Sequence, residues 1–175
     1  GVSHGQVFRF LHDEVEVPRY EVAEDEQDSE IARFKDALKQ THDQITEVRE
    51  SVARNLGDKE AAIFDAHLLV LEDQALIDDV VGEIHKTGDN VEQCLHRVSQ
   101  KYYDYFNQLK DEYLRERASD LQDISRRLLR NLVGATAAGT AFFAEPRILV
   151  SEDLTPSDAA SLDRSKVLGI ATESG

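Results

Sequence analysis

Histidine side chains are the first candidates for chemistry in this chain, because an unperturbed imidazole is largely neutral near pH 7 and can act as a nucleophile. His4 follows Ser3 near the start, where a chain is expected to fray. His42, His85 and His96 fall on predicted helices without a convincing acid–base neighbour. None of these positions predicts a nucleophile beside its base.

Motifs for phosphate and metal binding are also missing from the sequence. The chain has neither a G-x-x-x-x-G-K-[ST] loop nor a G-x-G-x-x-G loop, so it does not encode a kinase-type ATP site. A ferritin-like di-metal centre would need two Glu-x-x-His motifs on separate helices, and the chain has no such pair. We therefore predict no metal site in this chain.

The segment IFDAHLLVLED, residues 63–73, is unusually apolar for a single helix. The four consecutive apolar residues 68–71 circle the helix, so some of them must meet a second helix or a partner. Asp65, Glu72 and Asp73 surround them with acidic groups, as expected for a protein-docking patch. The residues alone favour the simpler alternative, in which His67 is an ordinary helical residue without chemistry.

Two further groups of side chains allow more than one interpretation. An aromatic group is expected to pack between helices, and it comprises Tyr102, Tyr103, Tyr105 and Phe106. An arginine group either forms ordinary helical ion pairs or stabilises a transferred phosphoryl group, and it comprises Arg115, Arg117 and Arg127. Sequence spacing does not separate these two roles.

Helical periodicity covers the middle of the chain. Apolar residues three and four positions apart predict helices at 29–56, 59–71, 74–86 and 89–133, the last with a break near 111–113. Helices are expected to end at Gly57, Gly88 and Gly134. Asp58 is expected to cap the second helix, and Asp89 is expected to form a capping box with Glu92. Positions expected to be buried are Ile31, Phe34, Leu38, Thr41, Ile45, Val48, Val52, Leu114, Ala118, Leu121, Ile124, Leu128 and Leu132.

Short strands are predicted on both sides of this helical region, at 6–11, 147–151 and 167–171, and Thr155–Asp158 has the pattern of a helix start. The first strand is expected to pair with the later ones, because a lone strand cannot satisfy its own backbone groups. The predicted fold class is therefore α+β, with a helical hairpin or bundle lobe inserted into a small, incomplete α/β lobe.

Composition limits the possible partners and compartments. The 175 residues carry a net charge of −15, which argues against nucleic acid as a partner. No stretch approaches the ~18 apolar residues of a membrane span, and no signal peptide is visible, so we expect no membrane association. Cys94 is the only cysteine, which fits a reducing cytoplasm. The absence of methionine and the glycine at position 1 indicate a piece of a longer protein.

Three signatures in this order, IFDAHLLVLED (63–73), YLRERASDLQDISRRLLRNLVG (113–134) and ILVSEDLTPSDAASLDRSKVLGIATESG (148–175), resemble the N-terminal region of Enzyme I of the bacterial phosphoenolpyruvate:sugar phosphotransferase system. The resemblance runs from the G-V-x-x-G-x-V start at Gly1–Val7 to Gly175 and is weakest in 12–55. In that family the ATESG-like ending continues into a Gly-x-Thr-Ser-His segment whose His carries the phosphoryl group. The resemblance thus implies that the active His lies just beyond Gly175, and that this fragment has no catalytic residue and is inactive alone.

The resemblance also implies an organisation into domains. Residues 1–20 would form the first part of a swivelling α/β phosphohistidine domain, residues 21–134 a helical lobe that docks the phosphocarrier protein HPr, and residues 135–175 the second, truncated part of the α/β domain. A C-terminal barrel that this chain does not include would bind phosphoenolpyruvate and magnesium and would form the homodimer. No cofactor is expected in the fragment itself.

Site residues follow from the motif positions. The HPr surface implied by the resemblance comprises His67, Leu69, Val70, Asp73, Gln74, Tyr113 and Arg117. Ala159 stands where the family commonly has a Thr that restrains the active His, so the resemblance implies a less tightly held imidazole in the parent protein. Gln74 and Ala75 stand where some relatives carry acids, so partner affinity is expected to differ.

The function implied is that of a phosphoenolpyruvate-protein phosphotransferase, a cytoplasmic transferase that accepts a phosphoryl group on a His and passes it to HPr during sugar uptake. Two alternatives stay open from the sequence. One is a nitrogen-regulatory paralogue of the same enzyme, and the other is a non-enzymatic, acidic helical interaction module with the same fold.

Overall fold

The structure is a computed structural model that describes residues 4–9, 16–134, 145–151, 154, 159, 162 and 164–173, without the side chains of residues 112–116 and 164. The chain divides into two compact units. The strand unit comprises residues 1–14 and 137–175, and the helical unit comprises residues 15–136. The sequence-based boundaries at 20/21 and 134/135 stay a prediction.

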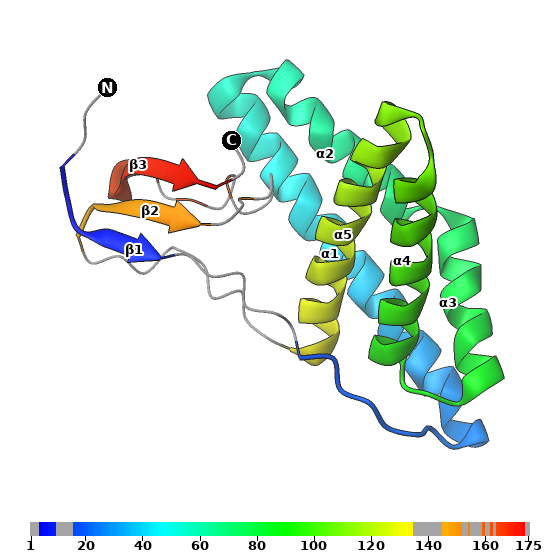
Figure 1. Cartoon of the computed structure of the whole chain (residues 1–175). Coiled ribbons are helices and arrows are strands. Elements are labelled where there is room, and N and C mark those ends of the chain that lie inside the picture. The colour runs from blue at the N-terminus through cyan, green and yellow to red at the C-terminus, as the bar shows by residue number, and fades with distance from the viewer. Residues whose placement is uncertain are drawn as a thin grey trace. The chain divides into compact units, whose positions relative to one another are not determined.

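A three-stranded parallel sheet forms the described part of the strand unit (Figure 1). Strand β2 (Arg147–Ser151) lies between β1 (Val7–Arg9) and β3 (Val167–Thr172), and β3 follows a short 3-10 helix, η3 (Arg164–Lys166). Phe8 pairs with Leu149, which in turn pairs with Ile170. The predicted pairing of the first strand with the later ones is confirmed, across about 140 residues of chain. The predicted helix start at 155–158 lies outside the described residues.

Five α-helices follow one another in the helical unit as the structure describes it: α1 (Gln27–Leu56), α2 (Asp58–Leu71), α3 (Gln74–Thr87), α4 (Val91–Gln108) and α5 (Glu112–Val133). A short 3-10 helix, η1 (Glu24–Glu26), precedes α1. The predicted helices are confirmed, and the predicted break separates α4 from α5 at residues 109–111. Gly88 ends α3 in the left-handed conformation with φ 67°, as its position predicts.

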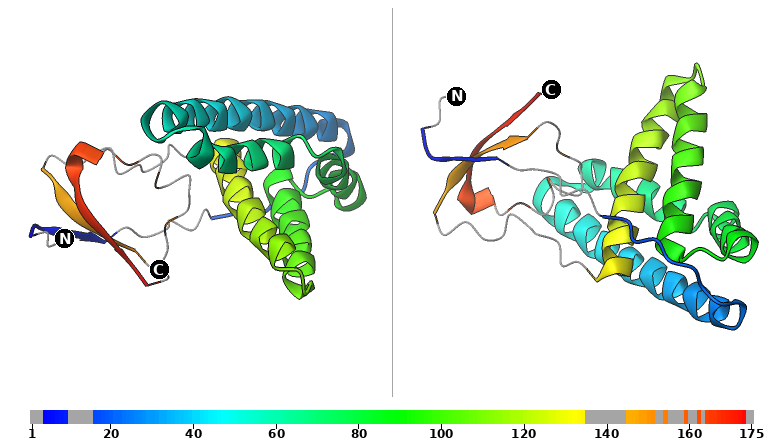
Figure 2. Two further views of the ribbon diagram at one scale, coloured as in Figure 1. Left: turned by 90° about the horizontal axis from the view of Figure 1, so that it is seen from above. Right: turned by 60° about the horizontal axis from the view of Figure 1, so that its bottom comes forward.

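Two helical pairs build the helical unit, α1 with α2 and α4 with α5, and α3 packs on α4 (Figure 2). Helix α5 also contacts α1 and α2 and so joins the two pairs. The buried core includes Phe34, Ile45, Phe64, Val80, Ile84, Leu95, Ile124 and Leu128. Of the predicted core positions, Ile31, Leu38, Val48, Val52 and Leu132 are only half-buried. Thr41 is fully buried, as predicted, and its hydroxyl donates to the Ala37 carbonyl.

Two predicted helix caps are wrong. Asp58 lies in the first turn of α2, whose N-cap is Gly57, with φ 111° and no side-chain cap. Helix α4 begins after Asn90, and no capping box forms between Asp89 and Glu92. The first backbone N–H of α4, that of Val91, donates instead to the Glu30 carboxylate on α1, 2.9 Å away. A cap supplied by a different helix leaves no local pattern in the sequence.

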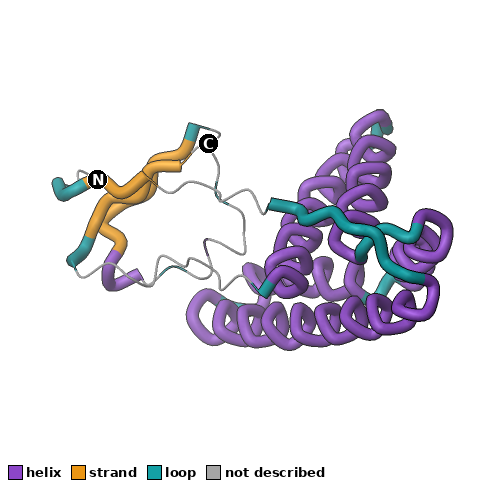
Figure 3. The backbone as a smooth tube through the Cα atoms, turned by 90° about the horizontal axis from the view of Figure 1, so that it is seen from below, coloured by secondary structure: helices purple, strands orange, loops and turns teal. Residues whose placement is uncertain are grey.

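The segment at residues 16–22 crosses the helical unit before α1 begins (Figure 3). Asn90 is fully buried and holds this segment from two sides. Its side chain donates to the Pro18 carbonyl and accepts from the Tyr20 N–H, while its backbone N–H donates to the Tyr20 carbonyl. The Val22 N–H donates to the Gly88 carbonyl at 2.7 Å. The connection between α3 and α4 therefore anchors the entry of the chain into the helical unit.

A cluster of polar and charged side chains lies beneath this segment, and we call Glu30, Arg33, Asn90 and Glu92 the Arg33 cluster. The Arg33 guanidinium donates to both carboxylates, Glu30 and Glu92, and reaches the Tyr20 hydroxyl at 3.0 Å. It also contacts the Leu132 carbonyl near the end of α5, at 3.4 Å. The two acids have side-chain exposures of only 9% and 2%, so Arg33 is what balances their charge.

A second, more exposed ion-pair group links α3 to α4 and makes stability depend on pH. Hydrogen bonding from Arg97, assisted by the charge of Arg19, holds the pKa of Asp89 below its usual value. Arg97 also lowers the pKa of Glu83. A carboxylate with a lowered folded-state pKa stabilises the fold above its unfolded-state pKa of about 4, and this stability is lost as the pH falls through the folded-state pKa.

We therefore expect Asp89→Asn to flatten the loss of stability between about pH 5 and pH 3. Urea unfolding of the parent and variant chains at several pH values in this window measures the effect. Asp36→Asn, at an exposed position of α1, is the matched control and is expected to leave the pH slope unchanged. Equal slopes for Asp89→Asn and the parent would contradict the role of the Arg97–Asp89 pair.

Candidate functional site

Helix α2 carries three of the seven residues that the sequence analysis singled out, His67, Leu69 and Val70, and its four consecutive apolar residues have different environments. Leu71 is buried, with 4% of its surface exposed, while Leu68 and Val70 are half-buried. Leu69 is 63% exposed, so neither the second helical pair nor any other described residue covers it. One large apolar side chain of this run therefore remains available at the surface.

His67 lies on the opposite side of α2 from Leu69, because residues two positions apart on a helix point in nearly opposite directions. Its side chain is fully buried. The ring stands edge-on to Phe64, with 5.6 Å between ring centroids, and its Nε2 atom lies 3.3 Å from Asp120 Oδ1 on α5. In this structure His67 joins α2 to α5, so the direct surface role expected for it requires correction.

The side of α2 next to α5 carries further apolar surface. Val70 lies three residues after His67 and Ile63 four before it, so both stand about 40° to 60° round the helix from His67, in the direction of Leu69. Ile63 is 39% exposed. Arg117 is half-buried on α5, three residues before Asp120, and therefore on the side of α5 that faces α2. Sequence reasoning missed Ile63, although its seven-residue spacing from Val70 was a usable signal.

Asp73 and Gln74 form the corner between α2 and α3, and both are exposed. Asp73 is the N-cap of α3, and its carboxylate accepts from the Ala75 N–H at 2.8 Å and from the Leu76 N–H at 3.4 Å. Gln74 donates to Asp78 Oδ1. Asp73 therefore stabilises the start of α3 at this corner and also gives the corner negative charge.

We expect Asp73→Ala to lower stability by about 1 kcal/mol, because an N-cap is lost. Asp73→Ser should recover most of that stability, because a serine hydroxyl can still accept from the α3 backbone, while the charge stays absent. Thermal unfolding of both variants measures the cap, and partner binding by Asp73→Ser measures the charge alone. If Asp73→Ala and Asp73→Ser were equally unstable, the capping role would be wrong.

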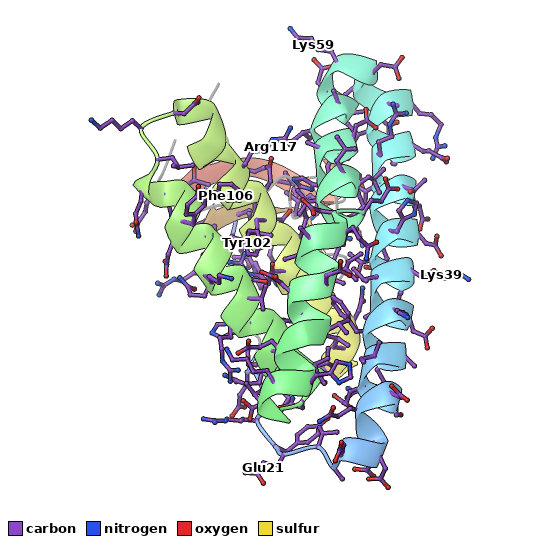
Figure 4. The ribbon with its side chains drawn as sticks, turned by 90° about the vertical axis from the view of Figure 1, so that its right-hand side faces the viewer. Glu21, Lys39, Lys59, Tyr102, Phe106 and Arg117 are labelled. Carbon is purple, nitrogen blue, oxygen red and sulfur yellow. The ribbon has the colours of Figure 1, made fainter. Side chains whose placement is uncertain are left out.

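Aromatic residues near the end of α4 extend the same region. Tyr105 is 61% exposed, whereas Tyr102 and Phe106 are half-buried and stand 6.3 Å apart between ring centroids (Figure 4). Burial and then the charge of Asp79 raise the pKa of Tyr102, with a smaller contribution from Asp73. The end of α4 therefore lies beside the start of α3. The half-burial of Tyr102 and Phe106 agrees with the predicted packing role, whereas Tyr105 is too exposed for it.

We call these residues together the docking face: Ile63, Leu69, Val70, Asp73, Gln74, Tyr102, Phe106 and Arg117. Acidic groups around it are only partly neutralised. Asp65 pairs with Arg49 at 2.9 Å, Glu72 lies 3.4 Å from His42 Nε2, and Asp79 lies 3.3 Å from Lys101. Tyr113 belongs to α5, but its side chain is outside the described residues. An apolar centre with an acidic surround suits a partner with a basic rim.

Ala159, the position expected near an active His, belongs to the strand unit and is exposed. Its carbonyl accepts from the Leu162 N–H at 3.4 Å. Among the residues that the structure describes, no group of three or more His, Cys, Asp or Glu side chains could hold a metal ion. A search of the same residues finds no helix both long enough and apolar enough to span a membrane.

The sequence profile of the family described as "PEP-utilising enzyme, N-terminal" matches residues 1–117. The chain belongs to this family. It is 35% identical to the phosphoenolpyruvate-protein phosphotransferase of Priestia megaterium and 31% identical to that of Haemophilus influenzae. Each match covers all of this chain and 30% of the relative. The chain thus spans less than a third of the length of these curated relatives of the PEP-utilising family.

Solved structures of the PEP-utilising family agree with this assignment. A solution structure of Enzyme I, designated nEIt, matches with a TM-score of 0.82 and 32% identity, covering 98% of this chain and 69% of that one. The "N-terminal domain of Enzyme 1 - Nitrogen" matches with a TM-score of 0.72 and 26% identity, covering 97% and 69%. The resemblance to the N-terminal region of Enzyme I is confirmed, as is a mainly helical fold with a small parallel sheet.

Proposed function

We propose that this chain is the part of a phosphoenolpyruvate-protein phosphotransferase that docks HPr. The parent enzyme would take a phosphoryl group from phosphoenolpyruvate onto a His and pass it to HPr during sugar uptake. A magnesium ion bound elsewhere in the parent would assist the first step. Support comes from the family membership and from the relatives that bear this enzyme's name. A cytoplasmic location and a homodimeric parent complete the proposal.

The finer architecture belongs to the same proposal. The helical unit would be a lobe inserted into a swivelling phosphohistidine domain, of which the strand unit is a part. The insertion is supported by the order of elements, since β1 precedes and β2 follows all five described α-helices. Ala159 would leave the active His of the parent less restrained than a Thr at that position.

Exposed Leu69 is the observation that carries the docking proposal. It is the most exposed large apolar side chain of the described residues, and it stands on a helix whose neighbouring surface is acidic. Basic partners are drawn to such a face over distances of about a Debye length, and apolar contact then holds them. Catalysis in the parent would consist mainly of aligning two imidazoles and stabilising the transferred charge.

Direct binding tests the proposal. The probe is HPr of Bacillus subtilis, an organism whose phosphotransferase is 32% identical to this chain over 175 residues. Calorimetric titration at low and at high salt should show one saturable site whose affinity falls as salt increases, because the charges around the face are exposed. No binding at millimolar HPr, with the helices intact by circular dichroism, would reject the docking role.

The sugar-uptake enzyme is preferred to the nitrogen-regulatory paralogue. Enzyme I nEIt is the more similar of the two solved structures, by TM-score and by identity. Binding of HPr and of a nitrogen-regulatory homologue of HPr by the same chain, measured side by side, discriminates between them. Tighter binding of the nitrogen-regulatory carrier would reverse the assignment.

A further inference from the structure

Three side chains that we call the His67 cluster connect α2 to α5: His67, Asp120 and Asp123. His67 is fully buried, with its Nε2 atom 3.3 Å from Asp120 Oδ1. Its Nδ1 atom faces Asp123 Oδ2 at 3.9 Å, which is too long for a hydrogen bond. Both of these atoms are buried and have no hydrogen-bond partner. Unpartnered buried polar atoms are rare, and here two of them face each other.

The chemistry of the imidazole explains the open contact. A carboxylate only accepts hydrogen bonds, so Nε2 must carry the proton that reaches Asp120. A neutral imidazole has no second N–H, and its Nδ1 lone pair then faces another acceptor on Asp123. Uptake of one proton from solvent at Nδ1 turns this atom into a donor. The same pair of atoms can then form a charge-assisted hydrogen bond of about 2.8 Å.

Closing that contact brings Asp123 Oδ2 about 1 Å nearer to His67 Nδ1, the difference between the present separation and an ordinary bond, and a movement of α5 toward α2 achieves this. The two helices carry the docking residues Val70 and Arg117, each three residues from a member of the cluster. We propose that the His67 cluster is a protonation-dependent connection that sets the spacing of α2 and α5 within the docking face. Its effect on binding rests on the proposed docking of HPr.

Other charged groups near the cluster come from three helices. On α5, Arg117 and Arg127 lie about one turn before Asp120 and after Asp123. Asp65 on α2 pairs with Arg49 on α1, and Glu72, the residue after α2, lies 3.4 Å from His42 on α1. His42 is a second imidazole that stands beside the end of α2, so it has to be removed before any pH effect on α2 is assigned to His67.

The test uses the chain with His42→Asn, followed from about pH 5 to pH 9 by imidazole nitrogen and backbone amide resonances. We expect Nδ1 of His67 to gain a proton in one step, and the amides of Val70, Arg117 and Asp123 to shift with the same midpoint. His85, exposed on α3 and bonded to Gln27, is the internal reference whose titration should leave these amides unmoved. A His67 that keeps one protonation state throughout, or that titrates without moving them, overturns the proposal.

A second variant separates structural damage from the proposed role. Asp123→Asn in the His42→Asn background should retain helix content and lose the shared titration of the α2 and α5 amides. If Asp123→Asn loses helix content, His67→Gln replaces it, because its amide forms hydrogen bonds without titrating. Co-titration of the two helices that persists in the folded variant would overturn the role of the cluster.

Binding of HPr by the same samples distinguishes the two proposals. Because HPr titrates as well, the readout is the difference in pH profile between the Asp123→Asn chain and its background. A difference centred on the His67 midpoint supports the link to docking, and identical profiles reject it. Failure to bind HPr at every pH would reject the docking proposal while leaving the amide result in the free chain valid.

Discussion

Replacing Leu69 by Glu is expected to weaken binding of HPr by roughly 30- to 100-fold, the loss typical of a central apolar contact at an interface. The substitution puts a charge where a partner would have to bury it, and it adds to an acidic surround. Leu69 is 63% exposed, so the fold itself should lose little stability. Calorimetric titration with HPr gives the affinity, and circular dichroism gives the helix content.

Leu56→Glu is the matched control for this experiment. Leu56 is the last residue of α1 and is 44% exposed. Replacing it by Glu therefore makes the same chemical change as Leu69→Glu, at another exposed position of the helical unit. Leu56 precedes the start of α2, and α2 rises about 17 Å between Asp58 and Leu69. Binding within about twofold of the parent is expected for Leu56→Glu. Equal weakening by both variants would indicate a general charge effect, and unchanged binding by Leu69→Glu would remove α2 from the interface.

Replacing Arg33 by Met is expected to destabilise the helical unit by about 3 kcal/mol, the low end of the range for leaving a buried charge without its partner, because the Arg33 side chain itself is 37% exposed. The variant leaves the carboxylates of Glu30 and Glu92 buried without their cation. It also breaks the contacts of Arg33 with Tyr20 and Leu132. Urea unfolding at neutral pH gives the free energy of unfolding.

Two comparisons make the Arg33 result specific. Arg54→Met removes an exposed arginine that stands 3.6 Å from Glu50, and such pairs contribute less than about 1 kcal/mol. The triple variant Arg33→Met, Glu30→Gln, Glu92→Gln removes the unbalanced charges and should recover part of the lost stability. An Arg33→Met chain as stable as Arg54→Met would show that the Arg33 cluster does not hold the fold together.

The helices and strands were predictable because their signals are local. The seven- and four-residue spacing of Phe34, Thr41 and Ile45 marks the buried side of α1, and these residues are buried. The short run of strand-favouring apolar residues within 147–151 (RILVS) similarly identifies β2. In such segments the apolar positions are the ones that become buried, so their spacing identifies the element without knowledge of the remaining chain.

Features that depend on residues far apart in the chain could not be predicted. Glu30 caps α4 from a position 61 residues away, so the local pattern at Asp89 and Glu92 suggested a capping box that does not form. The burial of His67 depends on two aspartates of α5, at positions 53 and 56 residues later in the chain. Its helix alone shows only an ordinary histidine among apolar neighbours.

The exposure of the site residues could be anticipated only in part, for a similar reason. Leu69 and Asp73 are exposed, as a docking role requires, and the apolar run on α2 was a visible signal. Tyr102 was assigned to packing, because nothing in the sequence places the end of α4 beside the corner that Asp73 caps. Which of these residues contact a partner stays a prediction.

Amide chemical shifts of the labelled chain during titration with HPr test the docking face most directly. We predict that the perturbed amides cluster at residues 63–74, at Tyr102–Phe106 and around Arg117, while those of residues 18–22 and 88–92 at the Arg33 cluster stay in place. Perturbations that cluster instead on the strand unit, or at the segment held by Asn90, would show that HPr binds elsewhere and would contradict the docking face proposed for this chain.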